Sequence, residues 1–160
     1  MIDHVLITEV GLRDGLQNEK VFVETQDKVS VVKSLINAGC CDVEVTAYVH
    51  KKRVPQMRDA EELVESLSVN EKVIYSALVP NVKGFLRVDS RKISKVSVML
   101  ATTESFCNSN LNCSIEESKG RAEEVVQKAK ENGMLSRAYI SCAVTCPYEG
   151  VVDPKLVRNL

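Results

Sequence analysis

The sequence predicts an α/β fold built on a parallel sheet, and three observations lead to that prediction. Short runs rich in β-branched residues alternate with helical patterns along the chain. These runs contain few polar interruptions, which is typical of strands covered on both faces. The stretches between them are long enough for right-handed crossover helices. This alternation indicates either an open doubly wound sheet or part of a (β/α)₈ barrel.

Five strands are expected along the chain, at residues 4–10, 42–48, 72–79, 95–100 and 137–144. Four complete crossovers join them, and the pair Asp153-Pro154 predicts the cap and first turn of a further helix. An open sheet is complete at 160 residues, whereas a barrel typically needs about 250. Periodicity alone leaves both architectures open.

The helices between the strands have recognisable beginnings and ends. Thr25 is expected to cap the first helix, whose apolar face includes Val29 and Val32, and Gly39 suits its C-terminal stop. A second helix is predicted over residues 59–67, where apolar residues recur at helical spacing.

The helix that follows the fourth predicted strand carries the clearest start signal. Ser114 and Glu117 have the form of a capping box, in which the cap and the residue three positions later bond each other's backbone. Ala122, Val125 and Ala129 continue a buried face at helical spacing.

Composition excludes several classes of protein. The chain is 44% hydrophobic and 27% charged, which is typical of one soluble domain, and its net charge of −1 argues against a nucleic-acid partner. No apolar run approaches the roughly 20 residues of a membrane span. The opening MIDHVLITEV leads directly into strand-like sequence, so we expect a cytoplasmic protein. None of the six cysteines forms a CxxC pair, which argues against a thiolate zinc site.

Polar residues gather directly after the first predicted strand. Functional groups of parallel α/β folds collect at the C-terminal ends of strands, and Glu9, Arg13 and Asp14 lie at such an end. Asp14 is a candidate ligand for a hard divalent cation. Arg13 is a fixed cation suited to stabilising negative charge on a carbonyl or carboxylate oxygen. The alternative interpretation is a surface Arg–Asp pair in a turn.

Glu44 is the second candidate, because it interrupts a stretch that is otherwise suited to burial. A buried carboxylate needs a partner. Glu44 therefore belongs either to a structural pair with Arg13 or a lysine, or to the support of an active site. The basic loop at residues 48–57 is interpreted as solvated charge or as a contact for a phosphorylated cofactor. His50 is expected at the surface, and His4 at the wrong end of the sheet for catalysis.

Several segments together resemble the hydroxymethylglutaryl-CoA lyase family, in the family's order and at its spacing. They are residues 9–20 (EVGLRDGLQNEK), 54–57 (VPQM), 80–85 (PNVKGF), 112–118 (NCSIEES) and 141–150 (SCAVTCPYEG). The resemblance implies a (β/α)₈ barrel to which this chain supplies about the first five β/α units. Residues 1–160 are then the N-terminal part of a single barrel domain.

The resemblance also implies an activity, the retro-Claisen cleavage of hydroxymethylglutaryl-CoA to acetyl-CoA and acetoacetate with Mg²⁺ or Mn²⁺. By similarity, Asp14 is a metal ligand, and Arg13 contacts the substrate and stabilises its enolate oxygen. Glu9 and Glu44 match acidic residues that orient Arg13 and the metal shell. Two further positions, Gln17 and Lys20, match contacts to the substrate or its CoA group. The family resemblance also points to a homodimer.

The metal site implied by the resemblance is incomplete in this chain. The other family ligands, a His-x-His pair and an Asn, come from later strands, and the sequence contains no His-x-His. Cys146 belongs to the fifth-strand motif and is not the family's catalytic loop cysteine. The sequence departs from the family pattern at Leu12, at His50-Lys51, at Arg53 and at Arg91-Lys92, where a residue suited to positive φ is lost. We therefore expect the isolated chain to be inactive.

Two alternatives to the lyase remain at this point. One is a related acyl-CoA-condensing synthase, although the segments 54–57 and 146–150 favour the lyase. The other is a non-catalytic half barrel, which would leave open sheet edges and associate with itself or with a partner.

Overall fold

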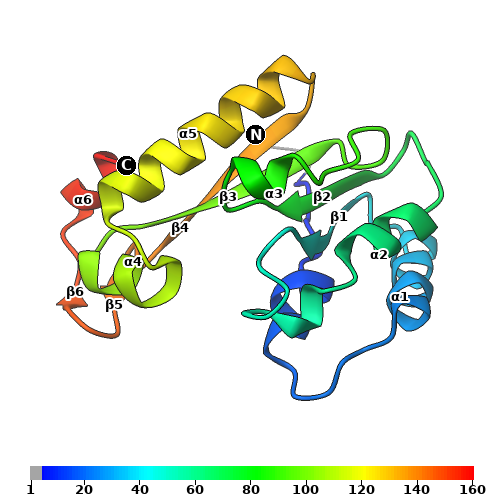
Figure 1. Ribbon diagram of the computed structural model, residues 1–160, viewed down its shortest axis with the longest axis horizontal. Coiled ribbons are helices and arrows are strands. Elements are labelled where there is room, and N and C mark those ends of the chain that lie inside the picture. The colour runs from blue at the N-terminus through cyan, green and yellow to red at the C-terminus, as the bar shows by residue number, and fades with distance from the viewer. Residues whose placement is uncertain (1–4) are drawn as a thin grey trace.

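The main sheet has four parallel strands in the order β1-β2-β3-β4 (Figure 1). The structure is a computed structural model and describes residues 5–160. The strands are β1 (Asp42–Ala47), β2 (Ile74–Leu78), β3 (Lys95–Ala101) and β4 (Leu135–Ser141). Because neighbours in the sheet are also neighbours in the chain, each connection is a simple crossover, as the alternating pattern predicts.

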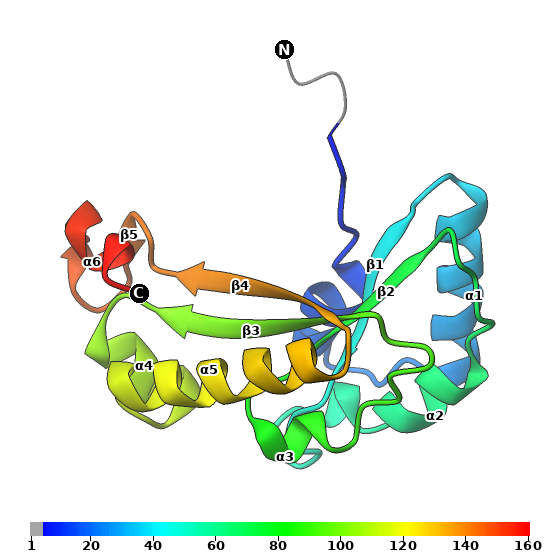
Figure 2. The ribbon, with the colours of Figure 1, turned by 90° about the horizontal axis from the view of Figure 1, so that it is seen from above.

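The crossover helices lie on the convex side of the curved sheet (Figure 2). They are α1 (Thr25–Asn37), α2 (Ala60–Ser66), α3 (Val82–Phe85) and α5 (Ile115–Glu131). Two further helices, α4 (Glu104–Leu111) and α6 (Pro154–Arg158), gather at the far end of β3 and β4, with the hairpin β5 (Thr145–Cys146) and β6 (Gly150–Val151). None of the described helices is long and apolar enough to cross a membrane.

The predicted strand at 4–10 is wrong for most of its length. Only Glu9 pairs with the sheet, through one parallel bridge to Val43, and residue 4 lies outside the described residues. The register explains the difference. In the register of that bridge, residues 5–7 would lie opposite residues 39–41, which precede β1 and include the turn at Gly39 with its φ of +95°. No described strand is there to receive them, and Ile7 remains 74% exposed.

The last predicted strand ends three residues early, at Ser141. Cys142 adopts a φ of +58°, a left-handed conformation that interrupts the extended backbone. The chain then forms the small antiparallel hairpin β5-β6, which the sequence pattern does not predict. Neither Arg91 nor Lys92 adopts a positive φ, so that departure from the family pattern strains no backbone.

The helix boundaries agree with the predicted signals except at Thr25. Glu24 occupies the cap position of α1 without a side-chain bond, whereas the Thr25 hydroxyl donates to Asp59 at 3.0 Å. The buried ammonium group of Lys28 lies 2.7 Å from the same Asp59 carboxylate. A tertiary contact between α1 and the start of α2 therefore takes the side chain that would otherwise cap the helix.

The remaining helix signals are confirmed. Ser114 and Glu117 form both bonds of the capping box at the start of α5, and Gly133 follows that helix with a φ of +68°. The Asp153 carboxylate accepts a hydrogen bond from the amide of Lys155 at the start of α6.

The hydrophobic core lies between the sheet and these helices. Val43, Val45 and Val96 on the strands are fully buried and belong to one cluster with Val32 and Val125 on the helices. α3 approaches the end of β1 so closely that a Cβ on Gly84 would come within 2.6 Å of the Tyr48 carbonyl oxygen. This core thus occupies the face covered by the helices, whereas the concave face carries polar side chains together with a smaller apolar cluster that includes Leu78 and Met99.

The capping box makes the stability of α5 testable. We expect Ser114→Ala to lower the free energy of unfolding by about 1 kcal/mol, because an N-terminal amide loses its acceptor. Urea denaturation measures the change. Ser34→Ala, within α1, is the matched control and should change stability by less than about 0.5 kcal/mol. Equal losses in both variants would contradict the assignment.

Candidate active site

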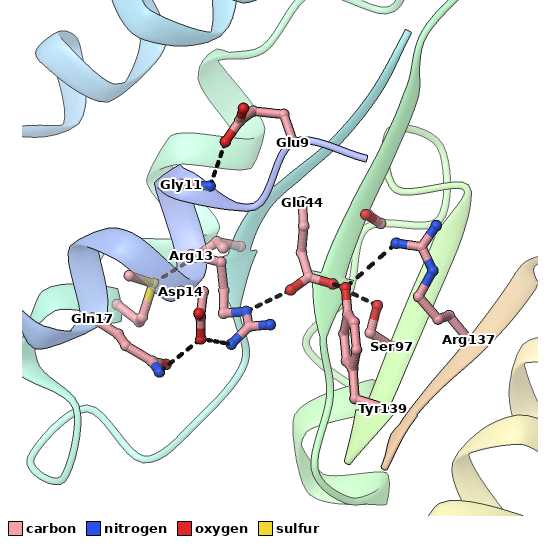
Figure 3. A network of polar contacts seen from close by, with 12 residues as sticks. Glu9, Gly11, Arg13, Asp14, Gln17, Glu44, Ser97, Arg137 and Tyr139 are labelled. Carbon is pink, nitrogen blue, oxygen red and sulfur yellow. Dashed lines mark hydrogen bonds and ion pairs between the residues drawn. The ribbon is translucent and has the colours of Figure 1, made fainter. Parts of the chain in front are cut away.

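Arg13 lies on a π-helical turn, Gly11–Gly15, that begins directly after the bridge between Glu9 and β1. The amides of Arg13 and Asp14 both donate to the carbonyl of Val10, at 3.1 and 2.7 Å. This turn directs the Arg13 side chain toward the concave face of the sheet, where the residue is only 3% exposed (Figure 3). Irregular π-helical turns of this kind often occur at functional sites.

Glu44 on β1 fixes the orientation of Arg13. Its Oε1 accepts a hydrogen bond from Arg13 Nε at 2.5 Å, and its Oε2 accepts from the hydroxyls of Ser97 at 2.5 Å and Tyr139 at 3.1 Å. The Tyr139 ring also lies against the guanidinium, 5.4 Å from centroid to Cζ. Glu44 is fully buried, so this set of donors is what compensates its desolvation.

Asp14 accepts a hydrogen bond from the same guanidinium, on the side away from Glu44. Its Oδ1 accepts from Arg13 Nη1 at 2.7 Å and from Gln17 Nε2 at 3.2 Å. The Asp14 side chain is 57% exposed, and its Oδ2 accepts no hydrogen bond from residues 5–160. One carboxylate oxygen beside a fixed cation is thus directed to solvent.

A second polar layer lies on the concave face, next to Glu44. Asp42 accepts hydrogen bonds from the Lys95 ammonium, from the Thr8 hydroxyl at 2.7 Å and from Arg137 at 3.2 Å. Burial raises the pKa of Asp42, but the hydrogen bonds from Lys95 and Thr8 and the charges of Lys95 and Arg137 together lower it below its usual value. Arg137 also donates to the Tyr139 hydroxyl at 3.4 Å, which joins the two layers.

The structure brings together four of the residues that the sequence singled out: Arg13, Asp14, Gln17 and Glu44. Glu9 stays apart from them. Its carboxylate accepts the Gly11 amide at 2.6 Å, and a Cβ at position 11 would come within 2.8 Å of that oxygen. Glu9 therefore shapes the turn that carries Arg13.

The other candidates lie at the surface or in the core. Lys20 and His50 are exposed. The charged residues 51–53 of the basic loop are exposed too, with Lys51 paired to Glu61 at 3.1 Å, whereas the ends of that loop are buried. Cys146 is buried, with its Sγ 3.1 Å from the Thr103 hydroxyl, and all six cysteines are free.

Sequence reasoning missed the strand residues that complete the site. They are Asp42, Lys95, Ser97, Arg137 and Tyr139. The signal was present, because polar residues recur two positions apart in three strands and so face one side of the sheet. Only the pairing of the strands shows that these polar pairs meet.

The described residues do not complete a metal site. No group of three or more His, Cys, Asp or Glu side chains within residues 5–160 lies close enough together to hold an ion. A hard divalent cation takes about six donors, and Asp14 offers one free oxygen.

The match to a protein family extends over nearly the whole chain. The family model described as HMGL-like matches residues 4–160. This chain belongs to the HMGL-like family. It is 44% identical to human 3-hydroxy-3-methylglutaryl-CoA lyase, cytoplasmic, over 99% of its length. It is also 42% identical, over 96% of its length, to the Pseudomonas aeruginosa 3-hydroxy-3-isohexenylglutaryl-CoA/hydroxymethylglutaryl-CoA lyase.

Solved structures of HMGL-like proteins resolve the architecture. The HMG-CoA lyase from Brucella melitensis matches with a TM-score of 0.93 at 40% identity, over 98% of this chain and 55% of that one. Because the structural neighbours are (β/α)₈ barrels, the parallel sheet is part of a barrel, as the resemblance implied, and is not an open doubly wound sheet. The chain spans about half the length of its relatives, 43% of the human protein and 51% of the P. aeruginosa protein.

The contact between Arg13 and Glu44 makes stability testable at this site. We expect Glu44→Gln to lower the free energy of unfolding by about 3 kcal/mol, because a buried guanidinium loses its main anionic partner. Asp14→Asn, which alters the half-exposed partner of the same guanidinium, is the matched control and should cost less than about 1 kcal/mol. Urea denaturation compares them, and equal costs would contradict the dominant role of Glu44.

Proposed function

We propose that this chain supplies the amino-terminal part of a hydroxymethylglutaryl-CoA lyase active site, which cleaves its substrate to acetyl-CoA and acetoacetate. One observation carries the proposal: Arg13 is buried, held by Glu44 and placed beside the exposed carboxylate of Asp14. The names of the relatives of the HMGL-like family support the same reaction.

The reaction needs a fixed positive charge. When the substrate hydroxyl loses its proton, the bond between its carbon and the carbon next to the thioester breaks, which gives the ketone of acetoacetate and a thioester enolate. The negative charge of the enolate develops on the thioester carbonyl oxygen, and protonation of its carbon gives acetyl-CoA. Arg13 supplies a guanidinium, and its hydrogen bonds to Glu44 and Asp14 hold that group in one orientation. A donor that is oriented before the reaction stabilises developing charge without a cost of reorganisation. We assign Arg13 to this catalytic role and Glu44 to positioning it.

Glu9 contributes through the backbone. Its bond to the Gly11 amide holds the first residue of the π-helical turn, and with it the position of Arg13. We therefore assign Glu9, like Glu44, to positioning.

We assign Asp14 as one ligand of a divalent cation, Mg²⁺ or Mn²⁺, because its free Oδ2 is a hard oxygen donor at the exposed edge of the site. The remaining donors would have to come from outside the described residues.

We propose an acyl-CoA as the substrate. A solved structure of an Acinetobacter baumannii HMG-CoA lyase in complex with coenzyme A and 3-methylmalate matches this chain with a TM-score of 0.89 at 26% identity. Gln17 donates a hydrogen bond to Asp14, and Lys20, three residues after Gln17, is an exposed cation. We assign these two residues to substrate and CoA binding.

We also propose that the natural protein is a homodimer and lies in the cytoplasm. The human, mouse, rat and zebrafish relatives include proteins named cytoplasmic, while other relatives are named mitochondrial. Fractionation of the source cells tests the location.

The test of function uses the natural protein at its native length, which intact-mass measurement establishes first. We expect acetoacetate from hydroxymethylglutaryl-CoA without any 2-oxo acid, which also separates a lyase from a condensing synthase. Arg13→Gln should lower kcat by about 10²- to 10³-fold. Arg91→Gln, at an exposed arginine before β3 and so at the opposite end of the strands, is the matched control and should leave kcat unchanged. Full activity of Arg13→Gln would refute the assigned role.

The isolated 160-residue polypeptide should behave differently from a closed barrel. β4 is paired on one side only within the described residues, and its Ile140 is 36% exposed, so we expect dimers or larger assemblies in light scattering. Ile140→Lys should shift the population toward monomer. We also expect no acetoacetate from this polypeptide. A monomer with a cooperative unfolding transition would contradict the open-edge interpretation.

A further inference from the structure

A cavity of about 420 Å³ lies between α1, the segment 66–72 and the start of β2. Tyr75 on β2 lines it at the amino-terminal end of the strands, the end opposite to the candidate active site. Figure 2 shows α1 and α2 side by side on the helical face of the sheet, with the segment that follows α2 beside α1. The apolar lining of the cavity comes from Val29, Val32, Ile36 and Leu67.

Tyr75 contributes a hydrogen-bonding group to this lining. The residue is 3% exposed, its hydroxyl forms no hydrogen bond with a described residue, and the hydroxyl oxygen keeps some solvent access at the cavity. Burial raises the pKa of Tyr75, so the hydroxyl stays protonated and remains a donor. A hydroxyl that reaches the cavity without a partner among the described residues is free to donate a hydrogen bond to a molecule bound there.

The charged side chains around the cavity favour an anion. Lys33 and Lys72 line it and are exposed, and neither forms an ion pair with another described residue. Glu71 is the one carboxylate among the described residues of the lining, which leaves a net positive charge. Asn70 is already occupied, because its side-chain oxygen accepts the amide of Lys72 at 3.0 Å.

We propose that this cavity binds a small carboxylate with an apolar tail, such as a medium-chain fatty acid. The tail would lie against the valines and Leu67, and the carboxylate would accept from Tyr75 and face the two lysines. Volume and lining are those of small-molecule sites, which are mostly apolar with a few polar groups. The site is independent of the lyase proposal, since it shares no residue with the cluster around Arg13 and Glu44.

Isothermal titration of the purified protein with octanoate tests the proposal. We expect saturable binding of one octanoate per chain in the submillimolar range. Tyr75→Phe should weaken binding about tenfold, because it removes only the hydroxyl that donates to a charged group. Lys72→Met should weaken it about threefold, as expected for an exposed cation. Bound octanoate should also raise the Tm of the wild-type protein but raise that of Tyr75→Phe less.

Three controls make the result decisive. Tyr148→Phe removes a tyrosine hydroxyl at the opposite end of the molecule and should bind octanoate as the wild type does. Lys52→Met removes an exposed lysine elsewhere and should also bind normally. Octanol, which has the tail without the charge, should bind at least tenfold more weakly. Equal binding of octanol, equal losses in the control variants, or no binding of octanoate would each overturn the proposal.

Discussion

Glu44 carries a carboxylate into the interior of the sheet, where water does not reach it, and the candidate site is arranged around the need to partner that group. Three donors meet its two oxygens: Arg13 from the turn after residue 9, Ser97 from β3 and Tyr139 from β4. An unpartnered buried carboxylate would cost several kcal/mol. The requirement therefore joins three distant segments of the chain on one face of the sheet.

The backbone on both sides of Glu44 is irregular in a way that brings its partners to it. The register between β1 and β2 shifts directly after Glu44, so that Thr46 and not Val45 pairs with Ala77. Such a bulge changes the direction of neighbouring side chains and is common beside functional sites. On the other side, Glu9 pairs with β1 at one residue only, after which the π-helical turn delivers Arg13 to Glu44. A longer strand at this point would carry Arg13 along the ladder and away from the carboxylate.

The concave face carries two layers of charged side chains, one around Glu44 and one around Asp42. The layer around Asp42 holds distant segments of the sheet together. Asp42 is contacted by two cations, Lys95 and Arg137, and by the Thr8 hydroxyl. Arg137 on β4 contacts both Thr8, the residue before the bridge, and Asp42, so these contacts connect β4 with the start of the sheet. The apolar core holds the helices to the outer face. The polar layers thus connect the strands across the inner face of the sheet.

The amino-acid pattern alone determined the α/β class, the crossover helices and the position of the Arg13-Asp14 pair at a strand end. These features depend on neighbouring residues, since periodicity, caps and glycine stops act over a few positions, as at Ser114 and Gly39. Tertiary structure alone decided the length of the first strand, the hydrogen-bond partner of the Thr25 hydroxyl and the partners of Glu44. The first strand depends on register with β1, and Thr25 bonds an aspartate 34 residues away. Glu44 reaches Tyr139 from a position 95 residues earlier in the chain. Contacts at such separations depend on how the strands pair, which no local pattern encodes.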